Sequence, residues 1–384
     1  MRFEFATAGR IIFGPGAVAE LGPLARAVGR RAFVVTGKDK IRHAGVIGDL
    51  EGAGLNCTLF GVAGEPTVDQ VREGAALFRS AGCELLIAIG GGSAIDAGKA
   101  IAALAANSGD VLDYLEVVGK GQPLKVGPFP MFAVPTTAGT GSEVTRNAVL
   151  GSAEHGVKAS LRSPLMLPRV AIVDPQVTLG LPPAITASTG LDALTQLIEP
   201  YVSKRANPMT DALCLDGLRA VVRSLVRAFE NGVDTAARAG MSYASLLGGL
   251  ALANAGLGVV HGFAAPIGGM FDAPHGAVCA AILPYGMEAN ILALRARDPE
   301  SEALARYGEI ARVLTGVSDA APEDGVEWVR ALVRKLKMPP LSRYGIAEKD
   351  FGSIAAKAAR AGSMKANPVE LTAEELIHVM EAAH

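Results

Sequence analysis

The sequence predicts an α/β domain over residues 1–181, followed by an all-helical domain over residues 182–384. In the first half, short apolar runs alternate with segments of helical spacing, a pattern typical of a parallel sheet covered by helices. In the second half the strand patterns disappear and long helical patterns follow. We place the boundary at Pro182-Pro183, because the residue before a proline resists helix and the ring fits a first helical turn.

Five short apolar runs of the first half are expected to form buried strands, and helical spacing marks the segments between them. The expected strands are Arg31–Thr36, Cys57–Phe60, Leu85–Ile89, Phe132–Val134 and Val170–Val173. The expected helices are Val68–Ala81, a helix from Ala94, and then Thr189–Ser203, Asp211–Asn231, Thr235–Ala255, Glu300–Leu314 and Glu323–Leu336.

The stretch Met241–Val260 is mostly apolar and about as long as a bilayer requires. It also contains four glycines, two serines and Asn254, and it runs directly into His261. We interpret it as a core helix of the helical domain, because a helix that is apolar all round belongs in a protein interior.

Charge and composition exclude several classes of protein. Basic and acidic residues nearly balance, 36 against 38, so neither nucleic acid nor a membrane is expected as a partner. Four cysteines are scattered without CxxC pairing, which argues against a disulfide framework and against a thiolate zinc site. The first residues lack the order of a signal peptide. We therefore expect a cytoplasmic protein.

The segment Gly90-Gly91-Gly92-Ser93 joins a predicted strand to a predicted helix. Three glycines allow a pyrophosphate to approach the backbone, and a helix start offers free N–H groups and a positive dipole end. Ser93 can cap the helix or donate to phosphate, and Asp96 and Lys99 follow on the helix. A plain tight turn is the alternative, and the usual Gly-x-Gly-x-x-Gly after the first strand is absent.

A second polar loop, Pro135–Thr145, follows another predicted strand. Its hydroxyl residues are Thr136, Thr137, Thr140, Ser142 and Thr145. Five hydroxyls among eleven residues indicate a ribose and phosphate neighbourhood, and a threonine-rich helix cap is the alternative.

Two of the six histidines, His261 and His275, fall in one segment of the helical half. We expect His261 to end an apolar helix and His275 to follow a turn rich in glycine and proline. Asp192 and Gln196 lie one turn apart on another helix. One aspartate and two histidines with an open position form a competent site for a divalent metal that polarises a substrate oxygen. The alternatives are hydrogen-bonded core histidines, and a solvated helix stripe of Asp192, Gln196 and Glu199.

Together these segments resemble the iron-containing (group III) alcohol dehydrogenase family over almost the whole chain. The matching segments are Phe13-Gly14-Pro15-Gly16, Gly90–Ile101, Pro135–Thr145, Asp174-Pro175, Gly190–Ser203, His261–Gly276 and Asn367-Pro368. The resemblance implies an N-terminal dinucleotide-binding α/β domain and a helical domain, the architecture shared with dehydroquinate synthases, with a metal in the cleft between them.

The resemblance also implies roles for individual residues. It implies that Asp192, His261 and His275 are catalytic metal ligands. It implies that Gly91, Gly92 and Ser93 hold the pyrophosphate, and it places Thr136, Thr137, Thr140 and Lys158 around the cofactor. We also expect Gly90, Asp96 and Ser142 of the same two segments to lie at the cofactor.

The chain departs from the family pattern at two positions of the metal site. The iron enzymes usually have a histidine ligand where this chain has Gln196, and a histidine for proton transfer where it has Ala265. A glutamine oxygen is a weaker and harder ligand than imidazole. The remaining set is similar to that of the zinc-dependent glycerol dehydrogenases, so Fe²⁺ or Zn²⁺ is expected, with Gln196 as a possible fourth ligand.

A third departure concerns the cofactor. Many family members have an aspartate after the first strand, where this chain has Gly37 flanked by Lys38 and followed by Asp39 and Lys40. An aspartate there would accept from the adenosine ribose and repel a 2′-phosphate. We expect NADP to be favoured over NAD, although Asp39 opposes this.

The function expected from the resemblance is an NAD(P)-dependent alcohol dehydrogenase or aldehyde reductase for a small alcohol or aldehyde. A metal-polarised alkoxide would give its hydride to the nicotinamide. The alternatives are a metal-free oxo-acid reductase similar to the maleylacetate reductases, a lyase similar to dehydroquinate synthase, and a non-catalytic cofactor-binding protein. The resemblance suggests a homodimer or larger homo-oligomer, formed through the N-terminal strand.

Overall fold

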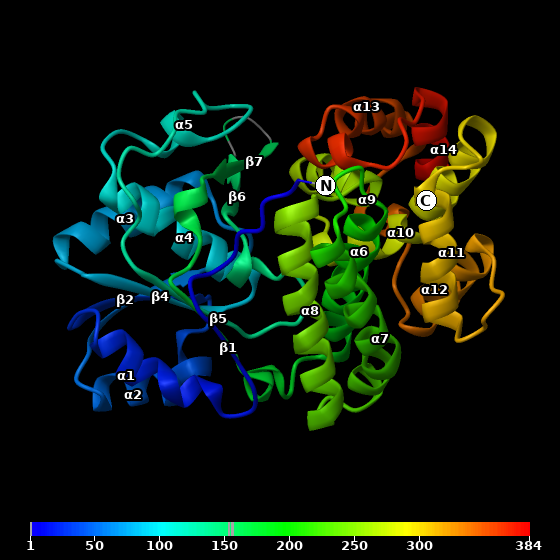
Figure 1. Ribbon diagram of the computed structural model, residues 1–384. Helices are drawn as coiled ribbons and strands as arrows, with labels where there is room; N and C mark the ends of the chain where they lie inside the picture. The colour runs from blue at the N-terminus through cyan, green and yellow to red at the C-terminus, as the bar shows by residue number, and fades with distance from the viewer. Residues whose placement is uncertain (1, 153, 155–156) are drawn as a thin grey trace. The chain divides into compact units, whose positions relative to one another are not determined.

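The computed structural model describes residues 2–152, 154 and 157–384, which separate into two compact units (Figure 1). The α/β unit contains Ala6–Thr137 and Gly141–Leu179. The helical unit contains Gly180–His384, together with Ala138–Thr140 and the N-terminal residues up to Phe5. The boundary between the two long segments therefore lies two residues before the predicted one. Three residues of the polar loop Pro135–Thr145, here called the Thr-rich loop, belong to the helical unit.

The α/β unit is built on a six-stranded parallel sheet with the order β1-β8-β5-β4-β2-β3. The strands are β1 (Ile11–Phe13), β2 (Arg31–Gly37), β3 (Asn56–Val62), β4 (Leu85–Gly90), β5 (Met131–Pro135) and β8 (Val170–Val173). All five predicted strands are confirmed, and β1 was not among the predicted ranges. Every residue of β4, β5 and β8 is buried, as expected for parallel strands covered on both faces.

Helices cover the two faces of this sheet, because successive strand residues point to opposite sides. On one face Phe33 and Val35 pack with α3 (Val68–Ser80) and α4 (Gly92–Ala106). On the other face Val34 packs with α1 (Leu21–Arg26) and α2 (Ala44–Gly52). Figure 1 shows α1 and α2 on the side of the sheet opposite to α3 and α4. A short helix, α5 (Val111–Tyr114), and an antiparallel hairpin of β6 (Asn147–Ser152) and β7 (Val157–Arg162) complete the unit.

The chain reverses its direction of travel across the sheet next to β2, which lies between β3 and β4. Thr36 of β2 pairs with Ile89 of β4, and Gly90 of β4 pairs with Pro135 of β5. The carboxyl ends of these strands therefore meet at one edge. Ligands of open α/β sheets bind at such a topological switch point.

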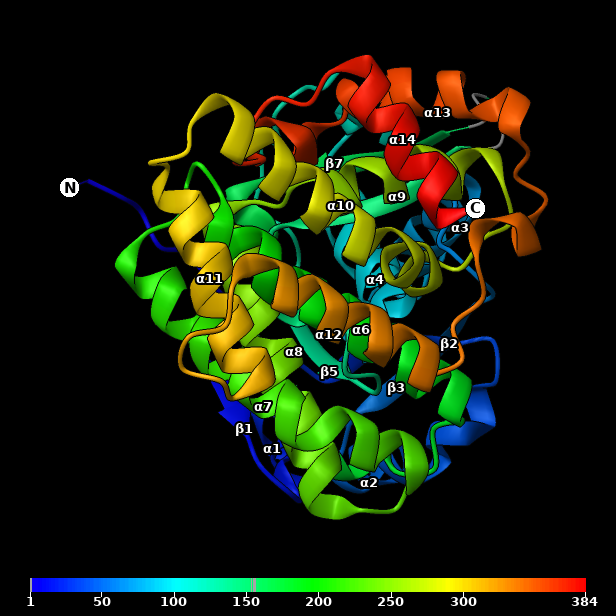
Figure 2. The same cartoon turned by 90° about the vertical axis from the view of Figure 1, so that its right-hand side faces the viewer.

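The helical unit contains no strand within its described residues. Its helices are α6 (Pro183–Val202), α7 (Pro208–Glu230), α8 (Thr235–Ala255), α9 (Val259–Met270), α10 (His275–Arg297), α11 (Glu302–Thr315), α12 (Pro322–Lys335), α13 (Glu348–Ala359) and α14 (Ala373–Ala383). The five predicted helices are all present, whereas α9, α10, α13 and α14 were not among the predicted ranges. Figures 1 and 2 show α6, α7 and α8 packed side by side.

The apolar stretch predicted as one core helix is broken. Helix α8 ends before Gly256, which has a φ of 78°, and α9 begins at Val259 with its axis turned by 97°. His261 therefore lies in the first turn of α9, so the expectation that it ends a helix was wrong. Within the described residues, α10 by itself is long and apolar enough to cross a membrane, and 78% of its apolar window is buried, as in a core helix.

The start of α9 is capped by side chains from distant parts of the chain. Val259 N donates to Asn367 Oδ1 at 3.0 Å, and Val260 N donates to Glu199 Oε1 at 2.6 Å. A Cβ at Gly258 would lie 2.8 Å from the first acceptor and 3.0 Å from the second. Position 258 therefore requires glycine if both acceptors are to reach the first turn.

Gly258→Ala should destabilise the protein by about 1–3 kcal/mol, because the added methyl displaces both capping acceptors. The midpoint of urea unfolding measures the effect. Gly352→Ala is the matched control: it lies in α13, and no described atom is within 4 Å of the added Cβ. The control should be neutral or stabilising by up to about 1 kcal/mol. Equal midpoints for the two variants would contradict the capping role.

Candidate metal centre and cofactor loops

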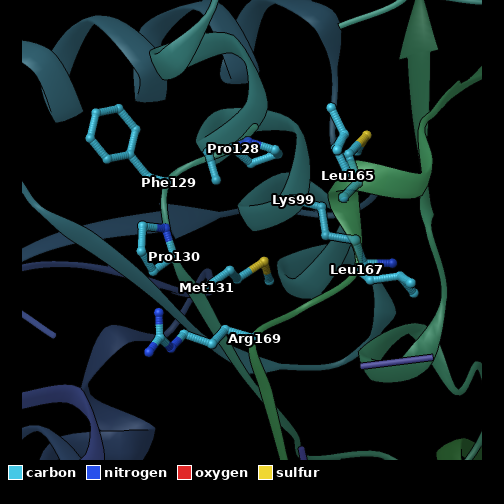
Figure 3. A pocket seen from close by; sticks show the side chains of 10 residues that line it. Lys99, Pro128, Phe129, Pro130, Met131, Leu165, Leu167 and Arg169 are labelled. Carbon is cyan, nitrogen blue, oxygen red and sulfur yellow. The ribbon is translucent and has the colours of Figure 1, made fainter. Parts of the chain in front are cut away.

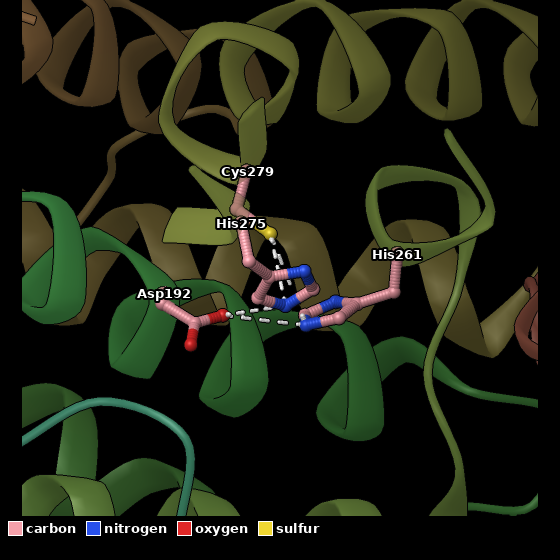
Figure 4. A group of neighbouring side chains, drawn as sticks. All are labelled: Asp192, His261, His275 and Cys279. Atoms are coloured by element: carbon pink, nitrogen blue, oxygen red, sulfur yellow. Dashed lines mark hydrogen bonds and ion pairs between the residues drawn. The ribbon is translucent and has the colours of Figure 1, made fainter. Parts of the chain in front are cut away.

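Four side chains from three helices converge in the helical unit (Figure 4). Asp192 comes from α6, His261 from α9, and His275 and Cys279 from the first two turns of α10. One donor atom of each lies within 4.8 Å of the others. Asp192 Oδ1 is 3.4 Å from His261 Nε2 and 3.6 Å from His275 Nε2. The structure thus brings together the three predicted residues and adds a thiol that was not predicted.

The acidic face of α6 points into the protein. Asp192, Gln196 and Glu199 are only 1%, 3% and 5% exposed, so the interpretation of these residues as a solvated stripe was wrong. Helix α10 starts directly against α6, where a Cβ at Gly276 would lie 2.4 Å from the carbonyl oxygen of Ser188. The missing side chain at Gly276 allows the close approach that brings His275 to Asp192.

Two buried oxygens of α6 lack a hydrogen-bond partner among the described residues, Asp192 Oδ1 and Gln196 Oε1. Leaving a buried acceptor unsatisfied costs about 1–3 kcal/mol, and more for a charged group. The orphaned carboxylate oxygen faces two imidazole nitrogens and a sulfur. This donor set fits a divalent cation, which would satisfy the carboxylate and both rings together.

The acidic and basic side chains at the centre shift one another's pKa values toward their charged forms. Burial alone would raise the pKa of Asp192, but the charges of His275 and His261 hold this pKa below its usual value. Burial also lowers the pKa of each histidine. The charges of Cys279 and Glu199 nevertheless raise the pKa of His261 well above its usual value. Those of Cys279 and Asp192 raise the pKa of His275 to about 9. Burial raises the pKa of the Cys279 thiol, and both imidazoles reverse this shift. The pocket therefore favours the anionic forms of Asp192 and Cys279.

Glu199 orients one of the rings. His261 Nδ1 donates to Glu199 Oε2 at 2.7 Å, which turns Nε2 toward Asp192. A carboxylate on the outer nitrogen of a ligating histidine sets its tautomer and its ring orientation. The sequence did contain a signal for this role, because Glu199 follows Asp192 by seven residues, two turns along the same helix face.

Gln196 and Ala265 are the two departures at this centre. A side-chain hydrogen bond from Gln196 contributes to the low pKa of Asp192, so the amide lies beside the carboxylate. Its role as a ligand stays a prediction. Ala265 lies on α9, one turn after His261, and is exposed. It offers no group that could accept a proton.

The predicted cofactor loops meet at the switch point of the α/β unit. Thr136 N donates to the carbonyl of Gly90 at 2.9 Å, and a Cβ at Gly91 would lie 3.3 Å from Thr137 Oγ1. Within the described residues, α4 has no side-chain cap, and Gly92 and Ser93 form its first turn. Backbone N–H groups at such a helix start are suited to a phosphate.

Three further predicted cofactor residues have partners within the α/β unit. Ser142 Oγ donates to Asp96 Oδ1, and Asp96 Oδ2 accepts from the backbone N–H of Val149 at 2.9 Å. Lys158 pairs with Glu65 at 2.8 Å. Asp96 and Ser142 thus join the Thr-rich loop to α4 and β6, and their contact with a cofactor stays a prediction.

A pocket of about 230 Å³ lies at the opposite edge of the sheet, where β5 and β8 begin (Figure 3). Its lining includes Lys99, Met131 and Arg169. The Lys99 ammonium is already engaged, because Nζ donates to Thr145 Oγ1 at 2.8 Å and to the carbonyl of Asn147 at 2.6 Å. Ligands of parallel sheets bind at the carboxyl ends of the strands, so we do not assign the cofactor to this pocket.

Comparisons with known proteins decide the family. The model of the iron-containing alcohol dehydrogenases matches residues 8–175, and that of the C-terminal domain of this family matches residues 186–384. The chain belongs to the iron-containing alcohol dehydrogenase family. It is 37% identical to alcohol dehydrogenase 4 of Saccharomyces cerevisiae, over 97% of this chain and 96% of that protein.

Two further members of the iron-containing alcohol dehydrogenase family are similar along their full length. The 1,3-propanediol dehydrogenase of Klebsiella pneumoniae is 36% identical, over 99% of this chain and 98% of that protein. The crystal structure of a 1,3-propanediol oxidoreductase has a TM-score of 0.92 and 35% identity, covering 100% of both chains. The predicted family, fold and enzyme class are confirmed: the protein is an alcohol and aldehyde oxidoreductase.

Membership of this family implies a nicotinamide cofactor and an iron-type metal, and the four-residue cluster could hold such an ion.

Glu199→Gln should weaken the binding of a divalent cation about 10- to 100-fold, because the neutral amide no longer holds His261 Nδ1–H by its charge. Competition with a chromophoric chelator measures the affinity. Glu309→Gln is the matched control, since Glu309 accepts from Tyr201 in the same unit and lies outside the cluster. An affinity that is unchanged by Glu199→Gln would show that this carboxylate does not support the site.

Proposed function

We propose that this protein is an NAD(P)-dependent alcohol dehydrogenase, working also as an aldehyde reductase, for a small alcohol or aldehyde. A divalent cation would be held by Asp192, His261 and His275. The observation that carries the proposal is the buried Asp192 Oδ1, which has no hydrogen-bond partner among the described residues and faces both histidine Nε2 atoms. A cation at this place would satisfy all three groups.

The reaction converts an alcohol and NAD(P)⁺ into an aldehyde, NAD(P)H and a proton. When bound, the cation supplies a Lewis acid for the substrate oxygen, and the nicotinamide supplies the hydride acceptor. Asp192 contributes a negative charge to the centre, and Glu199 holds the ring of His261 in place. Because Ala265 offers no proton acceptor, the proton leaves through water or a cofactor hydroxyl.

The nicotinamide cofactor is proposed to bind at the switch point of the parallel sheet. The uncapped start of α4 supports this, because its N–H groups and its dipole attract the pyrophosphate. The glycines there keep side chains away from the phosphates. The residues proposed to surround the cofactor are Gly37, Asp39, Gly90, Gly91, Gly92, Ser93, Asp96, Thr136, Thr137, Thr140, Ser142 and Lys158.

We infer a preference for NADP over NAD from the end of β2. No described atom lies within 4 Å of a Cβ placed at Gly37, so the residue leaves open space where a carboxylate would repel a 2′-phosphate. Lys38 adds positive charge next to this space, and Asp39 acts against it.

We also infer a cytoplasmic homo-oligomer. All four cysteines are free thiols, which suits a reducing compartment. The β1 strand lies at the edge of the sheet with Phe13 41% exposed, and an edge strand is a natural place for a second copy to extend the sheet.

Removal of the metal tests the proposed chemistry. Chelator-stripped protein should reduce small aldehydes with NADPH or NADH only after Fe²⁺ or Zn²⁺ is added without oxygen, as followed by the near-ultraviolet absorbance of the reduced cofactor. Asp192→Ala should lower turnover by about a thousandfold or more and leave cofactor binding intact, because the variant loses a cation ligand. Equal turnover without metal would favour the metal-free oxo-acid reductase instead.

Gly37→Asp tests the cofactor site. The added carboxylate should raise the KM for NADPH about tenfold or more and lower the KM ratio of NADH to NADPH, because it repels the 2′-phosphate and accepts from the ribose. Gly48→Asp is the control, since its Cβ also has no described neighbour within 4 Å and it lies in α2. A wild-type protein that clearly prefers NADH would refute the inferred NADP preference.

A further inference from the structure

Cys279 is the member of the cluster to which the proposed function assigns no role. It lies on α10 one turn after His275, so both side chains project from the same helix face. Its sulfur is 3.7 Å from His275 Nε2 and 4.0 Å from His261 Nε2 (Figure 4). The side chain is completely buried, and its polar neighbours are not those of an ordinary core thiol.

Four of the six separations between the donor atoms lie near the edges of a coordination tetrahedron, and the other two are within 4.8 Å. Metal–nitrogen and metal–oxygen bonds of about 2.0–2.1 Å and a metal–sulfur bond of about 2.3 Å give edges of roughly 3.3–3.7 Å. Asp192 Oδ1 lies 3.4 Å and 3.6 Å from the two Nε2 atoms, and the sulfur lies 3.7 Å and 4.0 Å from them. The four atoms therefore lie close enough together to surround one ion after small shifts of their side chains.

The charges of the cluster also suit a divalent cation that is bound by all four side chains. A thiolate at Cys279 and a carboxylate at Asp192 together neutralise a divalent ion, and the two neutral imidazoles complete the set. Asp192 Oδ1 adds to this argument, because it is buried without a hydrogen bond in the described part of the chain and has only the two histidine Nε2 ion-pair contacts at 3.4 Å and 3.6 Å.

We propose that Cys279 is the fourth protein ligand of this centre, which therefore consists of one carboxylate, two imidazoles and one thiolate. The inference rests on the proposed function, because it takes Asp192, His261 and His275 as the other three ligands. The metal replaces the protons that the imidazoles and the thiol hold in the cation-free cluster, and these protons are released to solvent. A soft thiolate favours zinc over ferrous iron, so the centre selects Zn²⁺ more strongly than an aspartate and two histidines would.

Cobalt(II) titration of the chelator-stripped full-length protein tests this ligand. A thiolate bound to cobalt produces an intense near-ultraviolet charge-transfer band, which oxygen and nitrogen ligands do not produce. The wild-type protein should show this band, whereas Cys279→Ser and Cys279→Ala should bind cobalt without it. Cys214→Ala is the matched control, since Cys214 is equally buried in the helical unit but lies outside the cluster. This control should retain the band.

Metal affinities provide a second readout. Cys279→Ala should weaken zinc binding by more than about a hundredfold, since losing a ligand should cost at least as much as losing an outer hydrogen bond. The preference for zinc over ferrous iron should fall about tenfold or more in this variant. Both affinities are measured by anaerobic chelator competition.

The outcomes separate this inference from the proposed function. If wild-type protein binds cobalt without the charge-transfer band, and Cys279→Ala binds zinc as tightly, the thiolate ligand is refuted while the three-residue centre stands. If neither wild type nor the Cys279 variants bind a cation, and Asp192→Ala makes no difference, the metal centre and the proposed function both fail.

X-ray absorption at the zinc edge of the wild-type protein needs no variant, so it decides the question even if Cys279 variants do not fold. One sulfur neighbour at about 2.3 Å, beside oxygen or nitrogen neighbours at about 2.0 Å, is expected. A shell of oxygen and nitrogen alone would overturn the proposal.

Discussion

The burial of the Asp192 carboxylate is the constraint on which the organisation of the helical unit depends. A buried charge costs several kcal/mol unless opposite charges or hydrogen bonds compensate for it. Asp192 is 1% exposed, and its Oδ1 faces the Nε2 atoms of His261 and His275. Compensation therefore requires α6, α9 and α10 to approach closely, and the missing side chain at Gly276 permits part of that approach.

The position of His261 depends on segments that are far away in sequence. Glu199 of α6 accepts from both the ring and the backbone next to it, and Asn367 accepts from Val259 N. Asn367 is held in turn by Asn290, since each amide nitrogen donates to the other residue's oxygen. The first turn of α9 therefore joins α6, α10 and the C-terminal segment into one hydrogen-bonded assembly. The loss of any of these contacts would change the orientation of the His261 ring, which is a candidate metal ligand.

In the α/β unit the candidate binding site consists mainly of backbone groups and not of charged side chains. The ends of β2, β4 and β5 carry glycine or proline, so little side-chain volume fills the switch point. Asp96 stiffens the adjoining loop by accepting from Ser142 and Val149. A site of this kind offers N–H groups and open space to a phosphate-bearing ligand, whereas the helical unit offers anionic and imidazole ligands to a cation. The two chemistries belong to separate parts of the chain and match the two needs of hydride transfer.

The sequence by itself determined five of the six strands of the parallel sheet and half of the α-helices among the described residues, because burial on two faces and helical spacing leave local patterns. It also predicted, through their motifs, that Asp192, His261 and His275 belong to one site, and the structure brings these side chains together. Only the tertiary structure decided that α8 breaks before α9, that Glu199 faces inward and that Cys279 joins the cluster. Periodicity describes each helix against its own axis, whereas the meeting of side chains from α6, α9 and α10 depends on crossing angles and close contacts between helices. Those contacts are made by residues that are distant in sequence, so no local pattern contains them.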